Sequence, residues 1–512
     1  MWYERSVHGC ERVPQSLKGE IVRKRSLKVA AAVGALCLVV AACAEDSSSD
    51  SSASAPAASS AVTEVPADSS APAATEAPAG TDATTGTEAT SDTTAGTDIQ
   101  EPEGDFTQEE IDQWGIEYTG ATPGEASGDP LTIGYVNQEA VFPENTVGIK
   151  AAIEYVNTEL GGFGGRPGEL VECDINVEED GTKCGSEMLN NPDVSFVLTG
   201  TLLVGNQPLY DVLDGKKPVI IGNAVTLADF LTTAGVGYPT GSVGVIPGMA
   251  DFAINRLDPK PTNAAIMYAD NPAGQAAYAS LLKPVFDLAG IPVTAVTVAD
   301  PGATAADVQA AMTAAGAGTA DVFISVITVQ TCVAMYDAMK ALGIDPVVVT
   351  TGLCFGTGMT DHLKEVGDSG QVPDGWYFGG YGYSYFMPDL DSGIATYLNK
   401  VEKYAKAPAG VTIEYTGFAG PSFGNILTIA KFANQLGGQV DTAAITPLIF
   451  GFEGPAMIQA GTLTCGKTAL LGITFPAVCG NEMGIQQYVD GQWKSAGDAL
   501  DGNPIDVTKI GT

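Results

Sequence analysis

Two short motifs in the sequence match patterns that carry chemistry in other proteins. The first, GTLTCGKT at residues 461–468, fits GxxxxGK[ST], a loop whose backbone amides wrap phosphates while a lysine, here Lys467, reaches them. Such a loop must follow a buried strand and open a helix. This one follows the helix-like GPAMIQA and leads towards Pro476, so nucleotide binding is not predicted.

The second motif, GPSFG at residues 420–424, fits GxSxG, the turn that presents a nucleophilic serine. That chemistry needs a histidine to take the serine proton, and in hydrolases of that fold the histidine comes later in the chain. The sequence holds only His8 and His362, and both precede Ser422. The motif therefore predicts a tight helix start.

Acidic residues could also act in pairs, since residues 131–512 hold 39 Asp and Glu against 17 Lys and Arg. Glycosidase chemistry needs a specific pair in a cleft, and no pair stands out. The excess acid more simply serves solubility, and the absence of a basic cluster disfavours nucleic acid. We predict no enzyme, no catalytic residue, no metal and no cofactor.

The N-terminal region has the features of an export signal. Basic residues at 23–28 precede an apolar run at 29–40, followed by Val-Ala-Ala-Cys at 40–43. The run is too short to cross a bilayer as a mature helix. The tetrapeptide resembles a bacterial lipobox, which implies a signal peptide at 1–42 and lipidation of Cys43; an incidental cysteine is the alternative. The expected location is extracytoplasmic, at the outer face of the cell membrane.

Residues 43–130 combine the anchor cysteine with a linker rich in Ser, Ala, Thr and Pro. Residues 44–130 hold 19 acidic and no basic residues and almost no large apolar ones, which predicts disorder. The exception is TQEEIDQWGIEY at 107–118. It fits either a short helix that docks on the folded domain or a sticky part of the tether.

Six cysteines remain after Cys43 and the two leader cysteines are set aside. An even number in an exported chain indicates disulfides. Six cysteines allow 15 pairings, of which pairing sequence neighbours is the simplest. No CxxC spacing or nearby histidine supports the rival metal site. The simplest pairs are Cys173 with Cys184, Cys332 with Cys354, and Cys465 with Cys479.

The segment 131–167 organises the rest of the chain. Leu131–Val136 is a short apolar run rich in strand formers, a polar loop follows, and apolar residues at helical spacing end at Gly161 and Gly162. Further strands are predicted at 169–175, 194–198, 218–221, 264–268, 293–298, 322–326 and 347–350, with helices between them. The alternation predicts an α/β fold with doubly wound parallel sheets, and the length predicts two lobes.

This opening segment resembles type I periplasmic binding proteins, and within them the branched-chain amino-acid-binding receptors of ABC importers. The likeness is carried by the NQ-containing loop, by AAIEYVN and by LGGFGGRPGELVECD. It implies one lobe from residues 131–250 plus 379–452 and another from 251–378 plus 453–512.

The resemblance also implies a function. It implies a monomeric, lipid-anchored receptor that captures a small polar organic solute, most simply a branched-chain amino acid, and passes it to the permease subunits of an ABC importer. A sensory receptor of the same fold that signals to a membrane partner is the alternative.

Ligands of such receptors sit at the carboxyl ends of strands from both lobes. Two positions depart from the family: the loop at 201–205 has no serine, and Ala273 stands where a tyrosine is usual, which suggests a larger or differently shaped ligand. An ordinary loop or core role is the alternative for each predicted contact. The predicted ligand-binding residues are Gln138, Phe142, Thr201, Leu202, Ala224, Thr226, Asn271, Thr328, Gln330, Leu353, Phe355 and Phe418.

Overall fold

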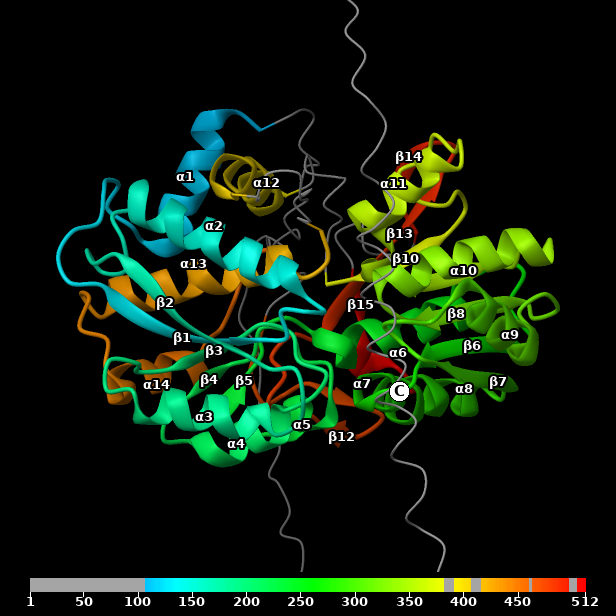
Figure 1. Cartoon of the computed structure of the whole chain (residues 1–512), viewed down its shortest axis with the longest axis horizontal. Coiled ribbons are helices and arrows are strands. Elements are labelled where there is room, and N and C mark those ends of the chain that lie inside the picture. Colours follow the sequence, from blue (N-terminus) through cyan, green and yellow to red (C-terminus); the bar gives the residue numbers. More distant parts are fainter. Residues whose placement is uncertain (1–105, 382–390, 407–415, 460–462, 497–503) are drawn as a thin grey trace, which may run out of the picture. The chain divides into compact units, whose positions relative to one another are not determined.

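The computed structural model describes residues 106–381, 391–406, 416–459, 463–496 and 504–512. The predicted signal peptide, Cys43 and most of the predicted linker lie outside these residues. The described part consists of two α/β lobes, each with its own sheet (Figure 1).

The first lobe contains a five-stranded parallel sheet in the order β2-β1-β3-β4-β5. Alternate residues of β1 face opposite layers, which is why the strand is buried throughout: Ile133 and Tyr135 pack in one core cluster, and Val136 packs in the other. The strands are β1 (Leu131–Asn137), β2 (Gly168–Asp174), β3 (Val197–Thr199), β4 (Val219–Ile220) and β5 (Gly235–Val236).

Helices cover both faces of this sheet, with α2 and α13 on one side and α3 and α4 on the other (Figure 1). Ser422 lies in the first turn of α13, as the GxSxG segment predicts. The helices of this lobe are α1 (Gln108–Thr119), α2 (Pro143–Thr158), α3 (Asp180–Asn190), α4 (Asn206–Leu213), α5 (Leu227–Leu231), α12 (Ser392–Tyr404), α13 (Ala419–Gln435) and α14 (Thr442–Phe450).

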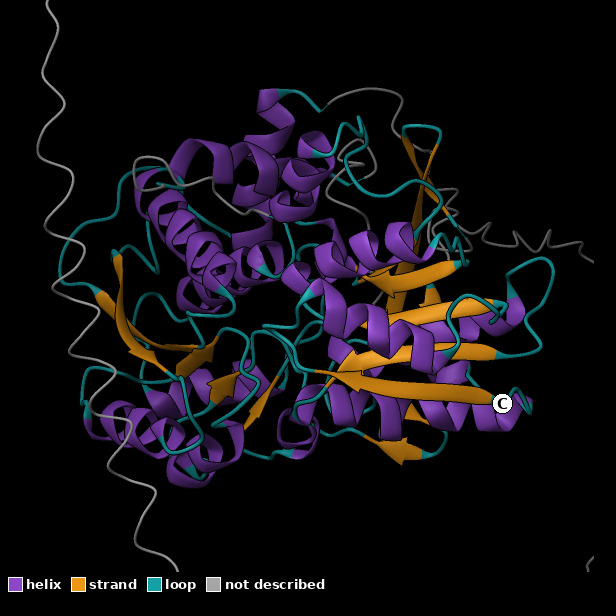
Figure 2. Ribbon diagram, turned by 45° about the vertical axis from the view of Figure 1, so that its right-hand side comes forward, coloured by secondary structure: helices purple, strands orange, loops and turns teal. Residues whose placement is uncertain are grey.

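The second lobe contains a larger sheet in the order β14-β13-β10-β9-β8-β6-β7, with β15 paired to β13. Figure 2 shows its strands side by side with helices on both faces. The sheet is parallel from β10 to β7, as predicted, and the chain adds β13, β14 and β15 to it as antiparallel strands. The strands are β6 (Ala264–Ala269), β7 (Val293–Val298), β8 (Val322–Val326), β9 (Val348–Thr351), β10 (Tyr377–Gly380), β13 (Glu482–Val489), β14 (Gln492–Ser495) and β15 (Ile505–Asp506).

The remaining elements complete the second lobe. A short hairpin pairs β11 (Ala469–Leu470) with β12 (Ile473–Thr474), so the GxxxxGKT segment runs into a hairpin and opens no helix. The helices are α6 (Gly241–Asn255), α7 (Pro272–Ala276), η1 (Ala277–Leu282), α8 (Lys283–Ala289), α9 (Ala305–Ala315), α10 (Val329–Leu342), η2 (Gly352–Phe355), α11 (Thr357–Glu365) and η4 (Val507–Lys509).

The chain leaves the first lobe between β5 and α6, and it leaves the second lobe after β10. Residues 477–479 still bond to Phe230 and Gly237 of the first lobe before β13 joins the second sheet. The boundary predicted at 250 falls inside α6, which packs on β9, β10 and β13, so we place the first crossing before that helix. Gln459 joins the chain at the first two crossings: its Oε1 accepts from the Thr240 amide at 2.9 Å, and its Nε2 donates to the Tyr381 carbonyl at 2.9 Å. Its Nε2 also lies 3.2 Å from the Glu482 carbonyl.

Helix α1 packs against α12 and α13 of the first lobe. It begins with a capping box between Thr107 and Glu110. Lys400 is 1% exposed and pairs at 2.6 Å with Asp112 of α1 and at 2.7 Å with Glu159. Of the two alternatives for residues 107–118, the structure shows the short helix docked on the folded domain.

Three disulfides confirm the pairing of sequence neighbours: Cys173–Cys184, Cys332–Cys354 and Cys465–Cys479. The first joins β2 to α3 in the first lobe. The second joins α10 to η2 in the second lobe, at the carboxyl end of β9. Among the described residues no helix is both long and apolar enough to cross a membrane, and no three His, Cys, Asp or Glu side chains cluster as metal ligands.

Candidate functional site

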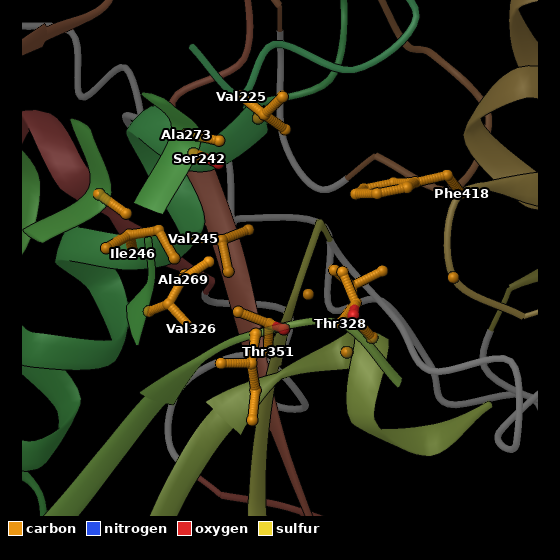
Figure 3. Close-up of a pocket in the computed structure, with 18 of the residues that line it drawn as sticks. Val225, Ser242, Val245, Ile246, Ala269, Ala273, Val326, Thr328, Thr351 and Phe418 are labelled. Carbon is orange, nitrogen blue, oxygen red and sulfur yellow. The ribbon is translucent and has the colours of Figure 1, made fainter. Parts of the chain in front are cut away.

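A cavity lies between the two lobes, at the carboxyl ends of β6, β8 and β9 (Figure 3). The space between its walls, open mouth included, amounts to about 1020 Å³. Its position is that expected for a ligand of two parallel-sheet lobes.

The wall from the first lobe is apolar and largely aromatic. Phe142, Leu203, Val225 and Phe418 form one buried cluster at the cavity. The Phe142 and Phe418 rings meet edge to face, with centroids 5.5 Å apart. Figure 3 shows Phe418 across the cavity from Val245, Ile246 and Ala269, side chains of α6 and β6. A ligand therefore lies between apolar surfaces on both sides.

The polar part of the cavity comes from the second lobe. Asp300, which follows β7, is the only charged side chain among its described lining residues. Its carboxylate accepts from the Thr328 amide at 3.0 Å, from the Thr328 hydroxyl at 2.7 Å and from the Thr331 hydroxyl. These bonds fix the carboxylate beside the cavity and keep it close to the start of α10.

Tyr381 connects the cavity to the crossings. Its ring stacks on Phe418 at 6.4 Å, and its hydroxyl donates to the Asn223 Oδ1 at 3.2 Å. Burial raises the pKa of the Tyr381 phenol well above its ordinary value, so it remains a neutral donor at physiological pH.

Six of the twelve predicted contacts line the cavity: Phe142, Asn271, Thr328, Leu353, Phe355 and Phe418. Asn271 also caps α7 through the Gly274 amide at 2.9 Å, and its Nδ2 donates to the Asp300 carbonyl at 3.2 Å. Four of the six belong to the second lobe, at the ends of β6, β8 and β9.

The other six predicted residues do not line it, and their surroundings give the reason. Gln138 accepts from the Leu203 amide at 2.9 Å, behind the wall. Thr201 bonds to Asn145 and Asn223. Leu202 and Ala224 are buried in the core of the first lobe. Thr226 caps α5 and borders a separate groove, and Gln330 is exposed on α10 of the second lobe.

Sequence reasoning missed Asp300, Thr351, Tyr381 and Gln486 as lining residues. Asp300 and Thr351 carry a usable signal, because both stand at the carboxyl ends of predicted second-lobe strands. Tyr381 and Gln486 carry none, since β10 and the antiparallel β13 are not among the predicted strands.

Among the described residues that line the cavity, no histidine stands beside a nucleophile to form a general acid–base pair. His362, the one histidine in the described part, bonds to Asp337 at 2.7 Å and does not line the cavity. The Ser422 hydroxyl donates to Asn145 at 2.7 Å inside the first lobe. The arrangement favours enclosure of a solute without covalent chemistry.

Solved structures share this fold at low sequence identity. An ABC transporter substrate-binding protein from Sphaerobacter thermophilus is 17% identical, with a TM-score of 0.58 over 75% of this chain and 99% of that one. A solute-binding protein of Rhodopseudomonas palustris, solved with 3,4-dihydroxybenzoic acid, is 15% identical, with a TM-score of 0.58 over 75% and 99%. A leucine-binding protein of Thermotoga maritima is 13% identical, with a TM-score of 0.54 over 71% and 97%.

No curated protein matches this sequence. The family model described as periplasmic binding protein, by contrast, matches residues 137–483, which include most strands of both sheets and every described lining residue except Gln486. The chain therefore belongs to the periplasmic binding protein family, in the type I group that contains the solute-binding proteins of ABC transporters.

Proposed function

We propose that this protein captures an amino acid with an apolar side chain outside the cytoplasm and delivers it to the permease subunits of an ABC importer. The observation that carries the ligand class is the charge of the cavity. Asp300 is its only charged lining side chain, among walls that are mostly apolar. An ammonium group is the natural partner of a desolvated carboxylate, and an apolar side chain suits the walls.

Branched-chain amino acids meet both requirements. Their ammonium group reaches Asp300 and Thr328, while the branched side chain packs among Phe142, Val225 and Phe418. Phe418 also precedes α13, whose N-terminal end brings the positive end of a helix dipole to the opposite wall, on the side suited to the ligand carboxylate.

Aromatic carboxylates are the second candidate class. The aromatic walls fit a benzene ring, and one structural neighbour was solved with 3,4-dihydroxybenzoic acid. A carboxylate without an ammonium group would meet the negative charge of Asp300, and the described lining residues include no Lys, Arg or His to offset it. We therefore favour the amino-acid class.

Thermal-shift titration of the purified domain tests this choice. Leucine, isoleucine, valine and phenylalanine are compared with benzoate and 4-hydroxybenzoate. A specific ligand at 100 times its Kd adds about 2.7 kcal/mol of stability. Stabilisation by carboxylates alone, with none by amino acids, would overturn the proposed ligand class.

The variant Asp300→Asn then tests the mechanism. Loss of the charge should weaken amino-acid binding roughly 10- to 100-fold, the usual worth of a hydrogen bond to a charged group. Asp361→Asn is the matched control, because Asp361 lies on α11 of the same lobe and pairs only with exposed Lys364 at 3.4 Å. Equal affinities in the two variants would contradict the role of Asp300.

We also propose that Cys43 carries a lipid that holds a monomeric receptor at the outer face of the membrane. The Val-Ala-Ala-Cys sequence and the apolar run before it support this proposal. Mass spectrometry of the mature N-terminus from native membranes tests it, with Cys43→Ala as the control. An N-terminus without acyl groups would contradict the lipid anchor, and sedimentation analysis tests the monomer.

A further inference from the structure

Among the described residues, four buried side chains have a polar atom without a hydrogen-bond partner: Tyr155, Thr240, Thr351 and Asn425. Thr351 is the one that also lines the ligand cavity. Its side chain is 8% exposed, and Figure 3 shows it at the cavity near Thr328. A buried hydroxyl without a partner is costly, so a partner that arrives with the ligand would remove a penalty.

The register of the sheet explains why the protein supplies no partner. Thr351 ends β9, where it lies opposite Gly379 of β10, a residue without a side chain. On the other side, Thr350 pairs with Ser325 of β8, which leaves Val326 next along that strand, beside Thr351. Glycine and valine offer the hydroxyl nothing to bond with.

The neighbouring threonine shows the opposite behaviour. Thr350 points to the other face of the sheet, as alternation along a strand requires. Its hydroxyl bonds to the Ser325 hydroxyl at 2.8 Å and contacts the Cys354 sulfur at 3.0 Å. Strand β9 thus carries two neighbouring threonines: the Thr350 hydroxyl has a hydrogen-bond partner in the protein, and the Thr351 hydroxyl, at the cavity, has none.

We propose that Thr351 is a specificity-determining contact whose hydroxyl bonds to a hydroxyl, carbonyl or amide group of the solute. This inference rests on the proposed function for the position of the ligand and extends it. Besides the group held at Asp300, the solute carries a second polar group that reaches the end of β9. Within the amino-acid class, this narrows the expected ligand from one with a wholly apolar side chain to one whose side chain adds a hydroxyl or an amide to its apolar part.

Matched ligand pairs test the inference. Calorimetry compares L-valine with L-threonine, L-leucine with L-asparagine, L-phenylalanine with L-tyrosine, and benzoate with 4-hydroxybenzoate. The wild type should prefer the polar member of at least one pair. Thr351→Val keeps the shape and removes the hydroxyl, so it should bind that member about tenfold more weakly and leave the apolar member unchanged.

Two control variants separate this effect from a change in packing. Thr351→Ser keeps the hydroxyl and should restore the preference for the polar member. Thr350→Val makes the same exchange on the other face, so it should lower the melting temperature without changing the preference. Thr351→Val itself should not lower the melting temperature, because it removes no hydrogen bond of the fold.

Preference for the apolar member of every pair in the wild type would overturn the inference, as would a polar preference that survives in Thr351→Val. Binding restricted to benzoate or 4-hydroxybenzoate would refute the proposed amino-acid class, while the comparison of that pair would still decide the role of Thr351. A wild-type protein that binds no member of any pair would overturn both.

Discussion

The two walls of the cavity differ in chemistry although both end parallel sheets. Among the described residues, the first lobe contributes Phe142, Leu203, Val225, Gly417 and Phe418, none of which has a polar side chain. The second lobe contributes the polar side chains: Ser242, Asn271, Asp300, Thr328, Thr351 and Gln486. The first wall supplies shape, and the second supplies orientation and selectivity.

The polar residues of the first lobe stand behind its wall and bond to one another. The Asn145 side chain bonds to Thr201 at 3.2 Å, to Asn223 at 3.2 Å and to Ser422 at 2.7 Å. Gln138 holds the Leu203 amide in the same way. A satisfied buried network fixes the position of apolar side chains but has little capacity left for a ligand.

The largest expected effect comes from breaking a second buried network of the first lobe, which is centred on Asp229 and holds the Val225 amide of the wall. Asp229 is 1% exposed and accepts from the side chains of Asn206, Tyr210 and Thr226 and from the Val225 and Thr226 amides. Asp229→Ala leaves these donors buried without an acceptor, so unfolding by urea should show a loss of about 3 to 5 kcal/mol.

Asp211→Ala is the matched control, because Asp211 is exposed and bonds to Gln207. It should change the free energy of unfolding by less than about 0.5 kcal/mol. A loss below 1 kcal/mol in Asp229→Ala would show that the network does not support the first wall.

The two lobes can be compared by removing one disulfide from each, since the same bond is lost in both cases. Replacing both cysteines by alanine, in Cys173–Cys184 or in Cys332–Cys354, should cost about 3 kcal/mol of stability in each case. Ligand affinity should fall only in the second variant, because Cys354 lies between the lining residues Leu353 and Phe355. Calorimetry below the melting temperature of both variants measures this, and equal affinities would contradict it.

Phe418→Ala should act on every ligand alike. Loss of the ring removes apolar contact worth about 2 kcal/mol, or roughly 30-fold in affinity, whether or not the ligand carries a second polar group. Phe418→Leu keeps part of the contact and should lose less. If the loss depends on the polar group of the ligand, the first wall takes part in selectivity after all.

The smallest expected effect is a loss of stability at low pH through Glu159. Burial opposes the ionisation of Glu159, but bonds from Lys400, Lys403 and Tyr404 outweigh it and hold its pKa below the ordinary 4.5. This carboxylate therefore stabilises the fold above about pH 4.5, and that stability is lost as the pH falls through the lowered pKa.

Glu159→Gln should show a smaller loss of melting temperature between pH 5 and 3 than the wild type shows. The difference between the two proteins at each pH isolates Glu159 from the other acidic groups. Ligand affinity at pH 5 should be the same in both, because Glu159 does not line the cavity. If both proteins lose the same melting temperature between pH 5 and 3, Glu159 and its three partners are not the source of the acid sensitivity.

The alternation of strand and helix patterns predicts most of the fold. The predicted strand at 264–268 and β6 (Ala264–Ala269) differ by one residue, and the run at 293–298 is β7 itself. The antiparallel return of β13–β15 follows from long-range pairing, which a local pattern does not contain. The docking of helix α1 depends on the pairing of Asp112 with the buried Lys400, some 290 residues away, and no local pattern contains that contact.

The sequence predicts which strand ends form the site, but it does not predict which side chains at those ends face the ligand. Asn271 and Thr328 follow β6 and β8 and line the cavity, as the position of a strand end implies. Thr201 occupies a similar place after β3 and turns inward to Asn145 and Asn223. Hydrogen-bond partners distant in sequence decide between these outcomes.

Helix α1 also determines which lobe bears a force applied to the N-terminal part of the chain. It is held to the first lobe by the Lys400 ion pair, by the bond of 2.8 Å between Tyr118 and Thr428, and by packing on α12 and α13. A pull on the chain before Gln108 is therefore borne by the first lobe, and the second lobe, which carries Asp300 and Thr351, is loaded only through its connections and contacts with the first.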